Sequence, residues 1–320
     1  MNCNYCEWRC DLSKGNGICG RYIVSNGIIA EKEPMSWISY YFYRIEEMPF
    51  FHALPGAIVM QIGTKGCNAS CDYCVNAHIA IKEEPGQTLK PITGKHLVQL
   101  AIDGGAGAVV FAINEVTVFL PSAIEAARAA HEAGLKVGCL TNGYLTEESA
   151  NMLGNEMDFI NISLKSISDE FYQKNLGLPS VKPILRNIKA LSKLAHIEVL
   201  TPIVHEITHD EVLKIAYFIA DVDENIPWHL FRLQPTYKRV DENPLDIGAM
   251  IKIVEQAKKI LPFIYFGNFA GSQWVNTRCP GCGHVLVKRV CIGSCGSKFG
   301  SIDMDGNRCP KCGKNIPVIR

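Results

Sequence analysis

The chain has 320 residues, of which 48% are hydrophobic and 20% charged, and its formal net charge is zero. This composition excludes a disordered chain and is typical of a globular protein with a substantial core. The balanced charge gives no reason to expect nucleic acid as a partner, and no apolar run approaches the roughly 18 residues that span a membrane. The first residues lack the basic and apolar regions of a secretory signal, so we expect a cytoplasmic protein.

Fourteen cysteines are many for a cytoplasmic chain, and most of them fall into short clusters. Spacings of the CxxC type are typical of metal ligands and argue against secreted disulfides. Cys139 stands alone in an apolar run, which predicts an ordinary buried side chain.

Residues 1–50 comprise the first cluster and a connector rich in aromatic residues. The cysteines of this segment are Cys3, Cys6, Cys10 and Cys19. Four thiolates can close a tetrahedral zinc site or bind an auxiliary iron–sulfur cluster. We favour zinc, because the segment carries no independent sign of a cluster, and the auxiliary cluster stays open as the alternative.

Residues 51–275 alternate short apolar runs with longer helical patterns, which predicts a parallel sheet with crossover helices. The expected strands are residues 57–62, 107–113, 136–140, 158–164, 197–203, 229–234 and 263–267. The expected helices cover about residues 94–103, 121–133, 181–194, 211–220 and 247–261. About six βα units result, so we expect an α/β fold built as a partial (β/α)6 barrel of the TIM type, smaller than a closed eightfold barrel.

The second cluster consists of Cys67, Cys71 and Cys74, which have CxxxCxxC spacing and follow the first expected strand. Three thiolates can ligate three irons of a 4Fe–4S cluster and leave the fourth iron open to a small molecule. A structural zinc site requires four ligands, and only His78 follows at short spacing. The spacing therefore favours an iron–sulfur cluster with an open iron.

Polar residues follow the next three expected strands. They are Asn114 and Glu115, Thr141 and Asn142, and Ser163 and Lys165. In barrels of this kind, functional side chains gather at the carboxyl ends of the strands. Any one pair could be an ordinary turn, but three pairs in succession after the cysteine loop predict one shared site.

Residues 276–320 contain two CPxCG units, which are typical of a zinc ribbon. The cysteines of these units are Cys279, Cys282, Cys309 and Cys312. Cys291 and Cys295 are surplus to a four-thiolate site, and the spacing leaves open whether they are free thiols or part of a variant ligand set.

These motifs resemble those of radical S-adenosylmethionine (SAM) enzymes related to pyruvate formate-lyase activating enzyme, and most closely the branch called AmmeMemoRadiSam. The resemblance covers nearly the whole chain. It is carried by residues 15–22, 67–76, 114–117, 140–144, 161–165, 227–229, 235–238, 267–268 and 276–280.

By this resemblance, Cys67, Cys71 and Cys74 bind the cluster, and the open iron takes the amino and carboxylate groups of SAM. The residues implied to contact SAM are Tyr73, Asn114, Glu115, Thr141, Asn142, Ser163 and Lys165. Reduction by a donor such as a ferredoxin or flavodoxin would cleave SAM to methionine and a 5′-deoxyadenosyl radical. The radical would abstract hydrogen from an unidentified protein, peptide or small molecule, as in enzymes that activate glycyl radical proteins.

Two features depart from the resemblance. Ser163 stands where activating enzymes commonly carry aspartate, and residues 204–210 replace a more usual turn. His205, Glu206 and His209 are therefore candidates for substrate contact or proton transfer. We favour the simpler interpretation, in which they cap the next helix and face solvent.

Three further residues carry weaker signals. Arg232 and Lys238 are candidates for binding an anionic substrate, although single basic residues usually face water. His229 lies in a strand-like run, and we expect a core histidine there.

The competing hypothesis is a non-catalytic iron–sulfur and zinc-ribbon module that binds a protein or nucleic acid. Release of 5′-deoxyadenosine from SAM distinguishes the two hypotheses, because only the enzyme produces it.

Overall fold

The computed structural model describes residues 1–81, 87–207, 209–268, 271–291, 293 and 296–320. Cys295, one of the two surplus cysteines, lies outside the described residues, so its role stays open.

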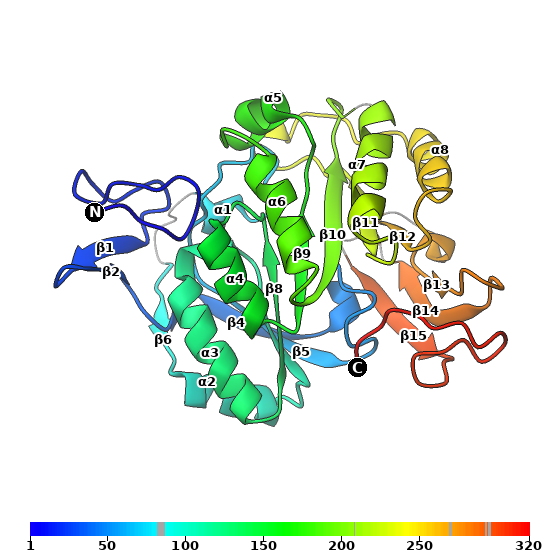
Figure 1. The fold of residues 1–320 in the computed structure, drawn as a ribbon, viewed down its shortest axis with the longest axis horizontal. Coiled ribbons are helices and arrows are strands. Elements are labelled where there is room, and N and C mark those ends of the chain that lie inside the picture. The colour runs from blue at the N-terminus through cyan, green and yellow to red at the C-terminus, as the bar shows by residue number, and fades with distance from the viewer. Residues whose placement is uncertain (82–86, 208, 269–270, 292, 294–295) are drawn as a thin grey trace.

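The central sheet contains seven consecutive parallel strands and one antiparallel strand beside them (Figure 1). In spatial order they are β12 (Ile264–Gly267), β11 (Trp228–Arg232), β10 (His196–Ile203), β9 (Phe159–Ser163), β8 (Lys136–Thr141), β7 (Ala108–Phe111), β5 (Ile58–Gly63) and β4 (Ser39–Arg44). All seven expected strands are present. In the described part of the chain β4 and β12 are edges, so the sheet is the open, partial barrel that the sequence predicts.

Helices connect the parallel strands and cover the sheet (Figure 1). The longer ones are α2 (Gly94–Asp103), α3 (Leu120–Glu132), α4 (Glu147–Glu156), α6 (Lys182–Leu191), α7 (His209–Val222) and α8 (Ile247–Ala257). Thr93 and Thr146 cap α2 and α4 by accepting a backbone N–H three residues on, and Pro121 occupies the first turn of α3. The shorter turns are α1 (Ala77–Ala80), α5 (Asp169–Phe171), η1 (Ile45–Glu47), η2 (Val116–Phe119), η3 (Tyr172–Leu176), η4 (Tyr237–Arg239) and η5 (Ser272–Trp274). None of the helices described is long and apolar enough to cross a membrane.

Two substantial elements, β4 and α4, were not expected from the sequence. Every residue of β4 is at least partly exposed, so no buried face marks this strand in the sequence. The side chains that α4 buries are mostly small, with Leu153 as the large one, and the helical period is correspondingly faint.

The carboxyl ends of the parallel strands form one edge of the barrel, here called the carboxyl rim, and the N-terminal segment packs on it. Trp8 Nε1 donates to the Asn68 carbonyl at 2.8 Å, and the Tyr22 hydroxyl donates to the Thr117 carbonyl at 2.8 Å. The segment includes the hairpin of β1 (Tyr22–Ser25) and β2 (Ile28–Glu31), followed by β3 (Ser36–Trp37), which pairs with β6 (Lys90–Pro91). The first cysteine cluster therefore lies beside the loops that follow β5 and β7.

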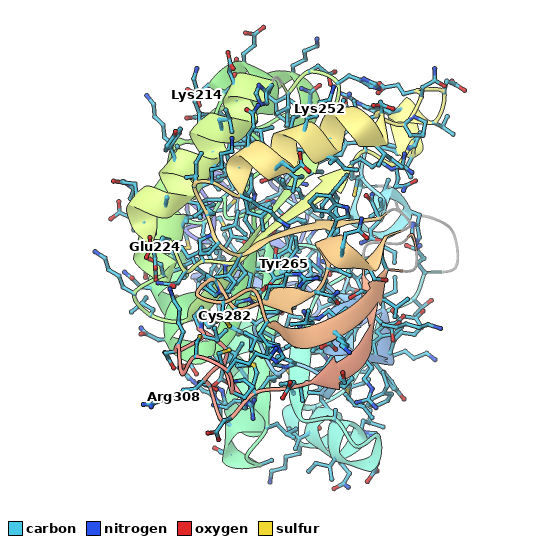
Figure 2. All side chains as sticks on the ribbon, turned by 90° about the vertical axis from the view of Figure 1, so that its right-hand side faces the viewer. Lys214, Glu224, Lys252, Tyr265, Cys282 and Arg308 are labelled. Atoms are coloured by element: carbon cyan, nitrogen blue, oxygen red, sulfur yellow. The ribbon has the colours of Figure 1, made fainter. Side chains whose placement is uncertain are left out.

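The C-terminal sheet packs elsewhere, on residues 51–53 and the beginnings of the strands. It contains β13 (Thr277–Arg278), β14 (Val285–Cys291) and β15 (Ser297–Ile302). Buried Arg289 donates to the Phe51 carbonyl at 2.6 Å, and the Glu198 carboxylate near the start of β10 accepts backbone N–H groups of residues 51–53. Figure 2 views the molecule from this side and labels Tyr265 of β12 together with Cys282 of the ribbon. The N-terminal segment lies on the far side of the barrel (Figure 1).

Candidate active site

A pocket of about 250 Å³ lies at the carboxyl rim. It is lined by all ten residues expected to hold the cluster and SAM, which are Cys67, Cys71, Tyr73, Cys74, Asn114, Glu115, Thr141, Asn142, Ser163 and Lys165. The structure thus brings these residues together, and what they bind stays a prediction.

The three thiols at the pocket fit an iron–sulfur cluster. Burial raises the pKa of Cys67 and of Cys74, and the neighbouring Cys71 raises both further, so these thiols release protons when they bind metal. The Ala69 N–H donates to Cys67 Sγ at 3.4 Å, a contact that steadies a ligating sulfur. Among the described residues, a group of potential metal ligands whose donor atoms all lie within 4.8 Å of one another is found elsewhere in the chain, and these three sulfurs do not form one. That wider arrangement suits a cluster better than a single ion.

The cysteine loop is fixed to the ends of β5 and β7 by two asparagines. Asn76 Nδ2 donates to the Ile113 carbonyl at 2.7 Å, and Asn114 Nδ2 donates to the Gly66 carbonyl at 2.9 Å. Asn114 Oδ1 also accepts the Thr64 N–H at 3.0 Å, so the whole amide of Asn114 braces the loop. Ile113 adopts a φ of 80°, a strained conformation for a β-branched residue that these contacts maintain beside the pocket.

Glu115 presents a buried carboxylate that is held from two sides. Its Oε1 accepts from the hydroxyls of Thr117 and Thr141 at 2.5 and 2.7 Å, and its Oε2 accepts the Asn142 N–H at 2.6 Å. Only 5% of Glu115 is exposed. A negative charge is therefore fixed in the pocket, where it can attract an ammonium group.

Lys165 supplies the opposite charge. Its Nζ lies 5.5 Å from the centre of the Tyr73 ring. Burial lowers the pKa of Lys165, but the charges of Cys71, Cys74, Cys67 and Glu115 outweigh it, so the net pKa is raised. The side chain is cationic and can pair with a carboxylate in the pocket.

Arg239, which the sequence analysis missed, clamps the cysteine loop from the segment after β11. Its guanidinium pairs with Asp72 at 2.9 Å and with Glu206 at 2.8 Å, donates to Asn175 Oδ1 at 2.6 Å, and lies 5.5 Å from the Tyr73 ring centre. A lone arginine gives no sequence signal, because its partners lie far away along the chain.

The wall of the pocket under β10 and β11 is largely apolar. Its apolar residues include Leu200, Pro202, Phe231 and Leu233, and its polar residues include Arg232 and Gln234. Of these, the sequence analysis singled out only Arg232. The alternation of Leu200 with Pro202 and of Phe231 with Leu233 was the available signal, because alternate strand residues share a face.

The remaining candidates lie away from the pocket lining. His205 and Glu206 are exposed, but Glu206 pairs with Arg239, and His205 Nε2 lies 2.8 Å from the Asn243 carbonyl. His209 is half-buried and is the first residue of α7, and a capping role for these residues stays a prediction. The Lys238 side chain lies over its neighbour Tyr237.

His229 is a core histidine, as expected. It is 1% exposed, and its Nε2 lies 2.6 Å from Glu198 Oε2.

The N-terminal thiols share a second, smaller cavity. It is lined by Cys3, Cys6, Cys10 and Cys19. Asn68 of the cysteine loop lines the same cavity, so this group directly adjoins the candidate active site.

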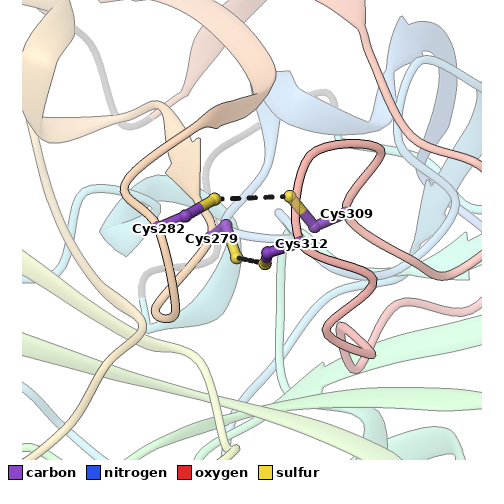
Figure 3. Close-up of side chains that lie close together, drawn as sticks. All are labelled: Cys279, Cys282, Cys309 and Cys312. Atoms are coloured by element: carbon purple, nitrogen blue, oxygen red, sulfur yellow. Dashed lines mark hydrogen bonds between the residues drawn. The ribbon is translucent and has the colours of Figure 1, made fainter.

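The four thiols of the CPxCG units form a compact group (Figure 3). The sulfurs of Cys279 and Cys312 are 3.5 Å apart, those of Cys282 and Cys309 are 3.6 Å apart, and all four lie within 4.8 Å. A Zn–S bond of about 2.3 Å places tetrahedral sulfurs about 3.8 Å apart, so this group could hold a metal ion of that kind. Cys291 is not part of the group among the residues described.

Fold and site together define an open α/β barrel with a cysteine-lined pocket at its carboxyl rim. Residues 62–219 match the family model described as the radical SAM superfamily, so this part of the chain is a radical SAM domain. A radical SAM domain implies a 4Fe–4S cluster and SAM.

One relative and two crystal structures are similar to this chain. Over its whole length the chain is 28% identical to an uncharacterized protein, MJ0808 of Methanocaldococcus jannaschii, covering 96% of it. Crystal structures of Streptococcus suis SuiB bound to SAM and to the precursor peptide SuiA share its fold with a TM-score of 0.52. The sequence identities are 12% and 13%, and the matches cover 63% and 64% of this chain. The chain spans about half of SuiB, 48% and 47% in the two structures, so the likeness concerns the fold alone.

Proposed function

We propose that this protein is an enzyme that reductively cleaves SAM and abstracts hydrogen from a protein, peptide or small-molecule substrate. When bound to Cys67, Cys71 and Cys74, a 4Fe–4S cluster would supply the electron that breaks the sulfur–carbon bond of SAM. The electron would come from a donor of the ferredoxin or flavodoxin class.

The observation that carries this proposal is the pair of opposite charges beside the three thiols. The methionine part of SAM bears an ammonium and a carboxylate, and the pocket offers the Glu115 carboxylate and the Lys165 ammonium. Glu115 is preorganised by four donors, so binding requires little rearrangement. Lys165 lies against Tyr73, whose ring we expect near the adenine.

The apolar wall of β10 and β11 is the side from which we expect the substrate. Leu200, Phe231 and Leu233 would contact an apolar part of it, and Arg232 would meet an anionic group. These side chains can also exclude water from a reactive radical. The substrate class stays open between protein, peptide and small molecule, and enzymes that activate glycyl radical proteins are the nearest model. By its motifs we place the chain closest to the AmmeMemoRadiSam branch.

Anaerobic reconstitution with iron and sulfide, followed by strong reductant and SAM, tests the proposal. We expect 5′-deoxyadenosine from the wild type and from the control Cys139→Ala, which removes a buried thiol outside the cluster, and none from Cys71→Ala. A protein that loads iron at Cys67 yet releases no 5′-deoxyadenosine would be the non-catalytic module instead. Deuterium transfer from a labelled candidate substrate into 5′-deoxyadenosine would then identify the substrate.

We further propose that Cys279, Cys282, Cys309 and Cys312 bind one zinc ion as a ribbon at residues 276–320. Their compact spacing supports this, and soft thiolates suit zinc. The ribbon is separate from residues 51–275, which we take as the catalytic domain, and we expect the protein in the cytoplasm.

A further inference from the structure

The N-terminal thiols have the local geometry of ligands. Cys10 Sγ accepts a hydrogen bond from the Ile18 backbone N–H at 3.4 Å, and the other three thiols line one small cavity together with it. Cys67 Sγ and Cys279 Sγ also accept a backbone N–H. N–H donors of this kind stabilise a thiolate that binds metal.

A comparison within the chain argues for a cluster rather than for zinc in this group. The ribbon thiols close to within 4.8 Å, as a single ion requires, whereas neither the N-terminal group nor the Cys67 group does so among the residues described. The four N-terminal thiols instead surround a void of about 10 Å³, close to the space that one water needs. Sulfurs that meet at a zinc ion leave no such void. In lacking the compact spacing of a single-ion site, the N-terminal group is like the Cys67 group, which we expect to hold a 4Fe–4S cluster.

A second observation points to a missing ligand. Asn68 lines this cavity and is 1% exposed. Yet its Nδ2 completes no hydrogen bond with any described residue. Buried amide donors are rarely left unpaired, and a cluster sulfide is an acceptor that this donor could reach.

We infer that Cys3, Cys6, Cys10 and Cys19 bind a second 4Fe–4S cluster that passes electrons to the cluster on Cys67. Four thiolates occupy all four irons, so this cluster has no open position for SAM or substrate, and electron transfer is the chemistry left to it. In each transfer the N-terminal cluster loses one electron and the Cys67 cluster gains it, with no bond or proton involved. The electron would be restored by a low-potential one-electron donor of the ferredoxin or flavodoxin class.

A single residue, Asn68, lies between the N-terminal thiols and Cys67 and could connect them for electron transfer. Asn68 lines the N-terminal cavity and precedes the Cys67 loop, and its Oδ1 lies 3.9 Å from Cys67 Sγ. Asn142 Nδ2 donates to the same Oδ1 at 2.6 Å, so the bridging side chain is fixed. Cys19 and Cys67 also line one common pocket of about 420 Å³. The electron relay rests on the proposed function, but the binding of an N-terminal 4Fe–4S cluster does not.

The first experiment counts metals in the full chain. The triple variant Cys67→Ala, Cys71→Ala, Cys74→Ala, reconstituted anaerobically, should retain about four irons and four sulfides per chain, against about eight of each in the wild type. After reduction with dithionite its electron paramagnetic resonance signal should not change on addition of SAM, because no iron is open. Cys139→Ala should match the wild type. A triple variant that holds no iron and one more zinc than the ribbon accounts for would overturn the inference.

The second experiment measures the relay. In the quadruple variant Cys3→Ala, Cys6→Ala, Cys10→Ala, Cys19→Ala, reduced flavodoxin should reduce the Cys67 cluster at least tenfold more slowly than in the wild type, as followed by freeze-quench spectroscopy. The single variant Cys10→Ser, which disturbs the segment less, should show an altered N-terminal signal. An unchanged reduction rate, with the Cys67 cluster intact, would overturn the relay. If the protein binds both iron–sulfur clusters and they exchange electrons but SAM is not cleaved, the proposed function is wrong and the inference of an N-terminal 4Fe–4S cluster is supported.

Discussion

The two cysteine-rich ends of this chain look alike in sequence but differ in where they pack. The N-terminal segment lies on the carboxyl rim, where Trp8 bonds to Asn68 of the cysteine loop. The C-terminal ribbon lies near the beginnings of the strands, where buried Arg289 holds it to Phe51. Spacing indicates that both ends can bind metal, but of these two groups only the N-terminal thiols share a cavity with Asn68 of the cysteine loop in the described part of the chain. The ribbon is expected to act in stability or in partner recognition.

The contrast predicts that changes beneath the ribbon affect folding, with the largest effect at Glu198. This carboxylate is fully buried and accepts backbone N–H groups of residues 51–53 as well as His229. Glu198→Gln turns an N–H donor toward these donors, so the free energy of unfolding should fall by about 3–5 kcal/mol. Urea unfolding followed by circular dichroism measures the change. As a control, Glu224→Gln at an exposed position (Figure 2) should change the free energy of unfolding by less than about 0.5 kcal/mol.

Glu198 also predicts a pH dependence of stability. Burial raises its pKa, but hydrogen bonds from His196 and His229 outweigh burial and hold the pKa well below the ordinary value of 4.5. The carboxylate therefore contributes stability that is full above pH 4.5 and is lost as the pH falls further. Metal-free wild type should lose stability over that range, and Glu198→Gln should lose less. Equal acid sensitivity in the two proteins would contradict this assignment.

On the opposite side, Arg239 should affect catalysis. Arg239→Leu leaves Asp72 and Glu206 unpaired next to Cys71, and loss of one partner of such a pair costs about 2–5 kcal/mol. We expect SAM cleavage to fall about 100-fold while the zinc content is unchanged. The exposed pair of Arg128 and Glu156 offers the matched control, since Arg128→Leu should have almost no effect. Normal cleavage by Arg239→Leu would show that the loop needs no clamp.

A smaller effect is expected at Glu115, where one charge is removed from the carboxyl rim. Glu115→Gln keeps the size of the side chain, removes the negative charge that we expect to bind the SAM ammonium, and turns an N–H toward the backbone N–H of Thr117 or Asn142. A hydrogen bond to a charged group contributes about 1.5–3 kcal/mol, so the Kd for SAM should rise about 10- to 100-fold. Equilibrium binding to the cluster-loaded protein measures this. Glu148→Gln, on the exposed first turn of α4, should leave the Kd unchanged.

The sequence sufficed for the parts of the molecule that depend on local pattern. The parallel strands are apolar runs buried on both faces, as in β7, and the polar residues after them converge because parallel strands end at one rim. Contacts between residues far apart in the chain could not be predicted from the sequence. Arg239 meets Asp72 across 167 positions of sequence, and the exposed strand β4 has no buried face to mark it. The N-terminal thiols show why spacing alone could not choose between zinc and a cluster, since four cysteines at such spacing can bind either.

The smallest effect on SAM chemistry is expected from the ribbon itself. Cys309→Ser with Cys312→Ser removes half of the proposed zinc ligands, and each variant chain should lose one zinc ion. Iron content should be unchanged, and SAM cleavage should change by less than about twofold, because no described residue of the ribbon lines the pocket. The N-terminal quadruple variant is the matched comparison, since it should lose iron and keep this zinc. Loss of iron from the ribbon variant would mean that the two ends are energetically coupled through the barrel, and the separation argued from their positions would be wrong.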